Sequence, residues 1–133
     1  MGLPMAKNLA NAGKKVKVFD VSKEMLDKAR NENLEVAENI DSLIDHEISF
    51  VITMLPEGKN SVDVYLGEKG IIKKVSKNCL LIDCSTIDIE TSIKIGKKAT
   101  EEKINMIDAP VSGGVMGAKK ATLNIMVGGT KES

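Results

Sequence analysis

The sequence has 133 residues, of which 42% are hydrophobic and 29% are charged, with 19 Lys and Arg balancing 19 Asp and Glu. This length fits one domain, and the apolar share is too high for a disordered chain. The balanced charge excludes the basic excess of a nucleic-acid binder, and no apolar run approaches the roughly 20 residues of a membrane span. We therefore expect neither nucleic acid nor a membrane as a partner.

The cysteine content bears on metal binding and on the cellular compartment. Cys79 and Cys84 are too few for a disulfide scaffold or a zinc site, so no metal is predicted. The first residues lack the basic segment followed by an apolar segment that marks a signal peptide. These features predict a cytoplasmic protein, or one of the mitochondrial matrix if the source is a eukaryote. His46, the single histidine, is interpreted as a surface residue.

The first half of the chain opens directly in a helix. One face of this helix carries Met5, Leu9 and Ala12. Gly13 is placed to end the helix, and a β-branched run over residues 16–20 predicts the strand that follows. A second helix follows, with Ser22 as its N-cap and Met25, Leu26 and Ala29 on its apolar face.

The second half alternates in the same way. Runs over residues 48–54 and 80–83 predict two strands, and a later helix begins near Asp88. The apolar face of that helix is predicted from Ile89, Ile93 and Ala99. The last two predicted strands are residues 104–108 and 123–127.

This alternation predicts an α/β fold with a parallel sheet. Most strand runs are continuously apolar, as expected of strands that are buried on both faces. No strand precedes the first helix, and the sequence stops just after a strand, so we interpret both ends as cuts through a larger protein. The predicted fold class is a Rossmann-type, doubly wound, mostly parallel sheet with flanking helices and a missing first strand.

An acidic residue follows the first predicted strand at a spacing typical of dinucleotide-binding folds. Asp20 lies 18 residues after Gly2, which would be the third glycine of a G-x-G-x-x-G loop whose first two glycines are absent. Such an Asp bonds the adenosine ribose and favours NAD over NADP. The alternative, a strand that happens to end in Asp before a turn, stays equally open.

Two further strand ends carry candidate ligand-binding residues, because ligands of open α/β sheets bind at the carboxyl ends of strands. The segment Met54, Leu55 and Pro56 ends one strand, although Pro56 alone explains a strand end. Ser85 and Thr86 follow the next strand, where their hydroxyls either donate to a ligand or cap the following helix, a role we expect for at least one of them.

Residues 108–114 form the most informative stretch. The chain leaves a strand, turns at a proline, and presents Ser112 followed by Gly113 and Gly114. Successive backbone N–H groups without side chains make an anion-binding concavity, which suits a carboxylate substrate. An ordinary glycine-containing connection is the weaker alternative.

Taken together, these segments resemble the β-hydroxyacid dehydrogenase family, and most closely its 3-hydroxyisobutyrate dehydrogenase branch. The matching segments are residues 1–9, 18–20, 51–56, 81–88, 108–114, 117–118, 122–123 and 126–129. The resemblance implies an N-terminal NAD(P)-binding domain, of which residues 1–133 are an incomplete copy, followed by a helical domain that is absent here. It also implies hydride transfer between NAD and a small β-hydroxy acid such as 3-hydroxyisobutyrate, in an enzyme that is a homo-oligomer.

The resemblance implies a role for each candidate residue. The cofactor is bound by Gly2, Asp20, Met54, Leu55, Pro56, Asn60 and Thr86, and the substrate carboxylate by Ser112, Gly113 and Gly114. No catalytic residue falls in this chain, because the family's lysine lies beyond Ser133, so we expect the fragment alone to be inactive. Ala121 and Asn33 stand where the family commonly has glycine.

Two alternatives to the dehydrogenase hypothesis stay open. The same loops serve a reductase of tartronate or succinic semialdehyde, which is an enzyme of the same kind acting on a different substrate. A non-catalytic nucleotide-binding module would be a protein of another class.

Overall fold

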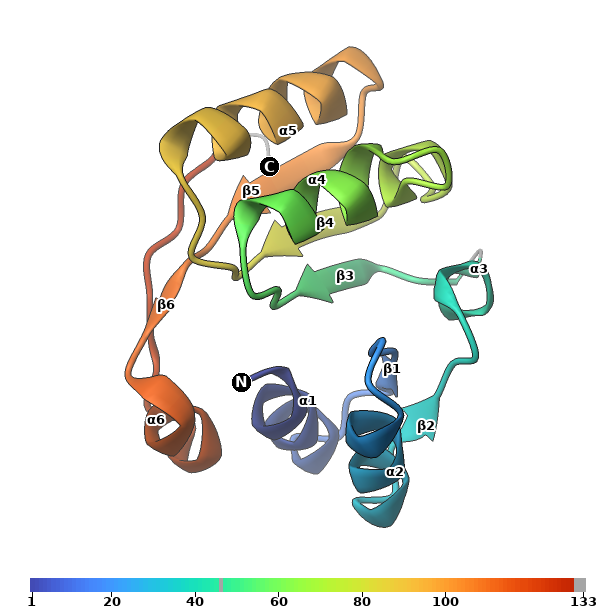
Figure 1. The fold of residues 1–133 in the computed structure, drawn as a ribbon, viewed down its shortest axis with the longest axis vertical. Coiled ribbons are helices and arrows are strands. Elements are labelled where there is room, and N and C mark those ends of the chain that lie inside the picture. The colour runs from blue at the N-terminus through green and yellow to red at the C-terminus, as the bar shows by residue number, and fades with distance from the viewer. Residues whose placement is uncertain (46, 131–133) are drawn as a thin grey trace. The chain divides into compact units, whose positions relative to one another are not determined.

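The computed structural model describes residues 1–45 and 47–130 and shows helices alternating with short strands (Figure 1). The chain divides into two compact units, one formed by Met1–Ile44 with Gly113–Leu123 and the other by Asp45–Ser112 with Asn124–Ser133. His46 lies outside the described residues, so its interpretation as a surface residue stays a prediction.

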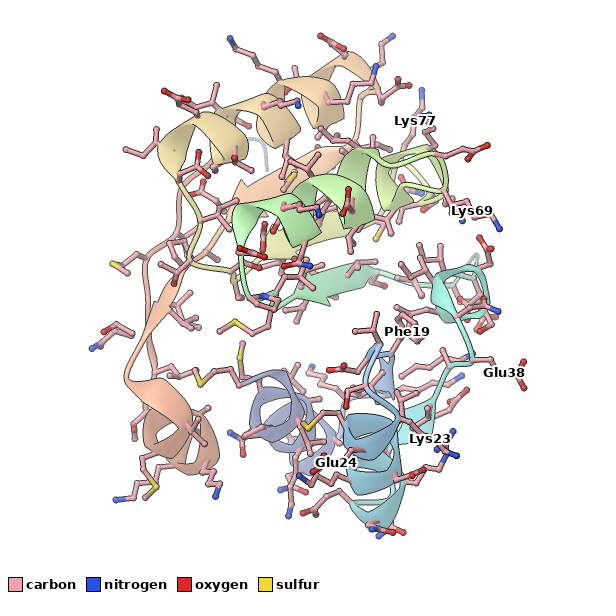
Figure 2. The ribbon with its side chains drawn as sticks, in the orientation of Figure 1. Phe19, Lys23, Glu24, Glu38, Lys69 and Lys77 are labelled. Carbon is pink, nitrogen blue, oxygen red and sulfur yellow. The ribbon has the colours of Figure 1, made fainter. Side chains whose placement is uncertain are left out.

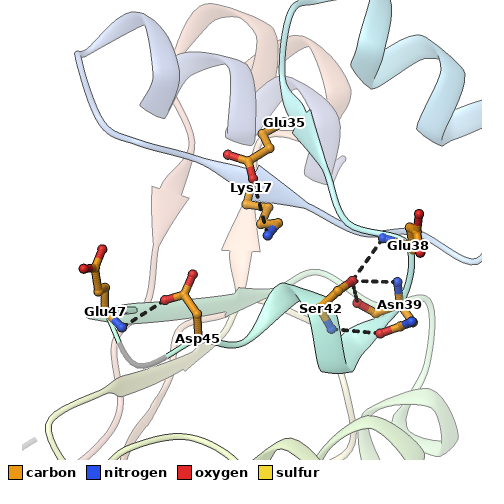
Figure 3. Close-up of polar contacts among 7 residues, drawn as sticks. All are labelled: Lys17, Glu35, Glu38, Asn39, Ser42, Asp45 and Glu47. Carbon is orange, nitrogen blue, oxygen red and sulfur yellow. Dashed lines mark hydrogen bonds and ion pairs between the residues drawn. The ribbon is translucent and has the colours of Figure 1, made fainter.

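The first unit holds one short parallel sheet and the helices around it. Its elements are α1 (Gly2–Asn11), β1 (Lys17–Val18), α2 (Lys23–Asn31), β2 (Glu35–Val36), α3 (Ile40–Leu43) and α6 (Gly114–Lys120). β1 pairs in parallel with β2, where Lys17 and Glu35 face each other and form an ion pair of 3.3 Å (Figure 3). Helix α1 packs against α6, and the Asn8 side-chain amide donates to the Ala118 carbonyl at 2.6 Å.

Local capping chemistry sets the helix ends in this unit. The Ser22 hydroxyl accepts from the Met25 N–H at 3.4 Å, which confirms the predicted N-cap of α2. Gly13 has a φ of +80°, a left-handed conformation that glycine adopts without strain, just after the end of α1. Helix α3 begins with a capping box, in which Asn39 and Ser42 bond each other's backbone N–H groups (Figure 3).

The second unit holds a three-stranded parallel sheet in the order β3-β4-β5. Its elements are β3 (Phe50–Thr53), α4 (Gly58–Leu66), the 3-10 helix η1 (Ile71–Lys73), β4 (Leu80–Asp83), α5 (Ile89–Glu101), β5 (Asn105–Asp108), β6 (Val111–Ser112) and β7 (Asn124–Ile125). The largest fully buried side chains include Tyr65, Ile71, Leu81 and Ile95, which form the centre of its core. Polar turns flank η1, where Lys69 and Lys77 point outward (Figure 2).

The parallel sheets confirm the predicted α/β class with flanking helices. The sheet of the first unit has the order β1-β2 and the larger sheet of the second unit has the order β3-β4-β5, with parallel neighbours in both. The last predicted strand differs, because β7 pairs antiparallel with β6, a strand that the sequence did not predict. Within the described residues, no helix is both long enough and apolar enough to cross a membrane.

Two expectations about burial are wrong. β3 is not buried on both faces, because Val51 and Thr53 are buried whereas Phe50 is 63% and Ile52 42% exposed. This alternation is that of a strand whose two faces have different surroundings. The core side of β3 is the one on which Thr53 bonds to Tyr65 of α4.

The predicted apolar face of α5 is wrong at Ile89 and Ile93 and right at Ala99. Ile89 is 77% and Ile93 52% exposed, whereas Ile95 and Ala99 are buried. Residues two apart on a helix point about 200° away from each other, so Ile93 and Ile95 cannot both face the core. The buried stripe is set by the packing of α5 on β5 and α4.

Candidate functional site

The carboxyl ends of β3 and β4 lie side by side and carry the two loops that the sequence singled out. Thr53 and Asp83, the last residues of these strands, are paired in register. The backbone N–H of Leu55 donates to the Ser85 hydroxyl at 2.9 Å, which ties the loop after β3 to the loop after β4. Leu55 and the segment of Thr86 are thus brought to one edge of the sheet.

The two helices that follow these loops also start close together. Asp88 is the N-cap of α5, and its carboxylate accepts from the Thr91 N–H at 2.8 Å. That backbone N–H lowers the pKa of Asp88 below its usual value. A side chain on Gly58, the first residue of α4, would place its Cβ 3.0 Å from the other Asp88 oxygen, so the absence of a side chain there allows the close approach.

The hydroxyl next to the strand end has a different role from the predicted one. We expected Ser85 or Thr86 to cap the following helix, but Asp88 caps it. Ser85 is 3% exposed and holds Leu55, while Thr86 is exposed. The prediction is wrong because the Ser85 hydroxyl accepts from the Leu55 N–H of the neighbouring loop, and the Asp88 carboxylate accepts from the Thr91 N–H at the start of the helix.

The other cofactor candidates of this unit flank the same edge. Met54 is half-buried and Pro56 exposed, both in the loop after β3. Asn60 lies in the first turn of α4, and its side-chain oxygen is buried without a hydrogen-bond partner among the described residues. A buried acceptor without a partner is costly, so Asn60 fits a ligand that offers a hydrogen-bond donor.

Gly2 and Asp20 belong to the first unit. Gly2 is the first residue of α1, and Asp20 lies exposed in the turn between β1 and α2. One Asp20 oxygen accepts from the Ser22 N–H at 2.8 Å, which is the bond of a tight polar turn. That contact accounts for one carboxylate oxygen, so both the turn role and the ribose-binding role stay open for Asp20.

Ser112 belongs to the second unit, whereas Gly113 and Gly114 belong to the first. Ser112 is exposed and pairs with Asn124 between β6 and β7 in the second unit. Gly113 and Gly114 open α6 in the first unit with φ values of +131° and +62°, conformations that strongly favour glycine. The anion-binding role of this segment stays a prediction.

Sequence reasoning missed the buried polar residues beneath the loops. Thr53, Ser61, Asp83 and Ser85 are the buried polar residues of the described chain, and all lie in the second unit. Their signal in the sequence is a polar residue at the end of an apolar run, as at Thr53 and Asp83. No group of three His, Cys, Asp or Glu side chains gathers into a potential metal site in the part of the chain that the structure describes.

Parallel βαβ elements with polar loops at the carboxyl ends of two strands define an α/β protein of the Rossmann-like, dinucleotide-binding class. The family model described as the NAD binding domain of 6-phosphogluconate dehydrogenase matches residues 1–133. The chain belongs to this family.

Similar proteins agree with this assignment. The 3-hydroxyisobutyrate dehydrogenase of Pseudomonas aeruginosa is 42% identical over 135 residues, which cover 99% of this chain and 44% of that protein. The mitochondrial 3-hydroxyisobutyrate dehydrogenase of Mus musculus is 40% identical over 132 residues, 99% of this chain and 39% of that protein. A solved structure of Mycobacterium tuberculosis 3-hydroxyisobutyrate dehydrogenase with L-serine matches with a TM-score of 0.91 and 35% identity, covering 99% of this chain and 44% of that one. The chain thus spans less than half the length of these relatives.

Proposed function

We propose that residues 1–133 are the NAD-binding domain of an oxidoreductase that transfers hydride between NAD and a small β-hydroxy acid, such as 3-hydroxyisobutyrate. The observation that carries this proposal is the 42% identity to a 3-hydroxyisobutyrate dehydrogenase along 99% of the chain. In such an enzyme, NAD accepts hydride from the carbon that bears the hydroxyl group. We propose that a helical domain completes the active site, and we assign no general acid or base to residues 1–133.

The proposed cofactor contacts come mainly from the edge where β3 and β4 end. Met54, Leu55, Pro56, Asn60 and Thr86 would line the cofactor, with Gly2 at the start of α1 and Asp20 at the adenosine ribose. The buried Asn60 oxygen, which has no partner among the described residues, supports this assignment. An Asp at the ribose repels a 2′-phosphate, so we propose NAD rather than NADP as the cofactor.

Asp20 gives the sharpest test of the cofactor proposal. In the native polypeptide that carries this chain, calorimetric titration should show tighter binding of NAD than of NADP. Asp20→Ala should weaken the binding of NAD and reduce the difference in affinity between NAD and NADP, because the ribose loses its hydrogen-bond acceptor. Asp27→Ala removes another exposed carboxylate of the same unit, one paired with Arg30, and should leave both affinities unchanged. Equal or tighter binding of NADP by the unmodified protein would contradict the proposal.

For the substrate, we propose that Ser112, Gly113 and Gly114 hold the carboxylate through the serine hydroxyl and the glycine N–H groups. The exposed hydroxyl of Ser112 and the positive φ values of the two glycines support this role. Ser112→Ala should lower kcat/KM for 3-hydroxyisobutyrate. The loss of transition-state stabilisation should be roughly 1–3 kcal/mol, the range for a hydrogen bond to a charged group. A matched alcohol without the carboxylate should be unaffected. Equal losses for both substrates would assign the segment a structural role.

The substrate assay should include L-serine, which is also a small β-hydroxy acid. It is present in the solved Mycobacterium tuberculosis relative. We further propose a homo-oligomer that acts in the cytoplasm, or in the mitochondrial matrix of a eukaryote, as the name of the mouse relative suggests for the latter. Analytical ultracentrifugation and cell fractionation test these two statements.

A further inference from the structure

A chain of hydrogen bonds runs beneath the edge where β3 and β4 end. The Tyr65 hydroxyl and Thr53 Oγ1 are 2.6 Å apart, and Thr53 Oγ1 is 2.9 Å from Asp83 Oδ1. The same Asp83 oxygen accepts from the Ser85 N–H at 3.0 Å, and the Ser85 hydroxyl accepts from the Leu55 N–H at 2.9 Å. The chain therefore connects the helix α4, both strands and both loops.

The number of hydroxyl protons determines which group donates in the Tyr65–Thr53 and Thr53–Asp83 hydrogen bonds. The Thr53 hydroxyl donates its single proton to Asp83 Oδ1. Thr53 Oγ1 then accepts, and the Tyr65 hydroxyl is the donor. Burial raises the pKa of Tyr65 well above its usual value, which keeps the phenol protonated and able to donate.

The residues of this series of hydrogen bonds are buried, so water cannot easily replace a bond that is lost. Tyr65 is 0%, Asp83 2% and Thr53 8% exposed. A buried donor or acceptor that loses its partner is not compensated by solvent, so the native arrangement is favoured over neighbouring ones. Asp83 is the branch point, because its Oδ1 accepts hydrogen bonds from both the Thr53 hydroxyl and the Ser85 N–H.

We propose that Asp83, backed by Thr53 and Tyr65, is a positioning residue that fixes the loops of Leu55 and Thr86 for cofactor binding. The inference rests on the proposed function, in which these loops line NAD. Asp83 is too buried to touch the cofactor and acts through Ser85, whose N–H it accepts and whose hydroxyl holds Leu55. Cofactor affinity then depends on side chains that lie behind the binding surface.

The test compares variants that remove or keep one hydroxyl. Thr53→Val removes the hydroxyl at nearly constant shape, Thr53→Ser keeps it, and Ser85→Ala breaks the last bond of the chain. Ser61→Ala is the control, because Ser61 is also 0% exposed but its hydroxyl has no hydrogen-bond partner among the described residues. All variants are made in the native polypeptide that carries this chain.

Two measurements report positioning separately from folding. Hydrogen exchange of the Leu55 amide should be at least about tenfold faster in Thr53→Val and Ser85→Ala, with wild-type rates in Thr53→Ser and Ser61→Ala. The affinity for NAD should fall by about tenfold in the same two variants, seen as a raised KM for NAD with a smaller change in kcat.

The outcomes separate this inference from the proposed function. Unchanged Leu55 exchange and NAD affinity in Thr53→Val would overturn the positioning role, and so would a Thr53→Ser variant as impaired as Thr53→Val. If Thr53→Val does not fold, Ser85→Ala decides by the same two measurements. If the unmodified protein binds no NAD, the proposed function fails, and a wild-type Leu55 exchange rate in Ser85→Ala then overturns the positioning role as well.

Discussion

Ala121 offers a test of how backbone strain is distributed in this fold. It ends α6 with a φ of +55° and a ψ of +38°, in the left-handed region. An L-residue with a Cβ pays roughly 1–2 kcal/mol there, whereas glycine pays no such penalty. Glycine costs about 0.4–1 kcal/mol through the greater freedom of the unfolded chain. Because Ala121 is exposed, its methyl group contributes little burial, and Ala121→Gly should stabilise the protein by about 1 kcal/mol.

The measurement is the free energy of unfolding in urea, at fixed pH and protein concentration. Ala12→Gly is the matched control, because Ala12 also follows a helix and is exposed but has a φ of −81°. That control should lose about 0.5–1 kcal/mol, since only the cost of the flexible unfolded chain applies. The reasoning is refuted if both glycine variants lose stability, because strain at Ala121 would then be negligible.

Four further predictions concern two glycines, a helix cap and two buried thiols. A Cβ on Gly70 would lie 2.4 Å from a backbone carbonyl oxygen near the end of α4, so Gly70→Ala should destabilise by about 2 kcal/mol or more. A Cβ on Gly96, inside α5, meets nothing within 4 Å, so Gly96→Ala should stabilise the protein by about 0.5–1 kcal/mol. For Gly70→Ala and Gly96→Ala the measurement is the free energy of unfolding in urea. The pKa of Asp88 is lowered in the folded protein, so its ionised carboxylate stabilises the fold above the unfolded-state pKa. This stabilisation is lost as the pH falls through the native pKa. In Asp88→Asn, the free energy of unfolding should therefore depend less on pH below about pH 4. Burial raises the pKa of Cys79 and Cys84, so a thiol reagent at neutral pH should label neither until the protein unfolds.

Features written in local sequence were predicted well. The strand Leu80–Asp83 has the predicted bounds, and Ser22 caps α2 as expected. Both follow from short-range chemistry, a bounded apolar run in one case and a hydroxyl before a helix in the other. The resemblance also singled out Asn33 and Ala121, and the structure supplies the physical reason, since both have positive φ values where glycine would be unstrained.

Features that depend on distant partners were not predicted. The spacing of Ile89 and Ile93 fits a helix face, but the packing of α5 chose the face of Ile95 instead. Ser85 has the local signature of a helix cap, yet the register of β3 and β4 brings it to Leu55. The place of the two loops at the carboxyl ends of β3 and β4 was therefore predictable, whereas the buried Thr53 and Asp83 beneath them were not.

The composition of the first unit has a consequence for biosynthesis. Helix α1 is synthesised before its partner α6, and the bond from Asn8 to Ala118 spans 110 residues. At about 5–20 residues per second, α1 waits roughly 5–20 s for that partner to be synthesised. The chain between them includes most of the second unit, which can fold on local contacts first. The first unit is thus completed only after most of the second unit has been synthesised.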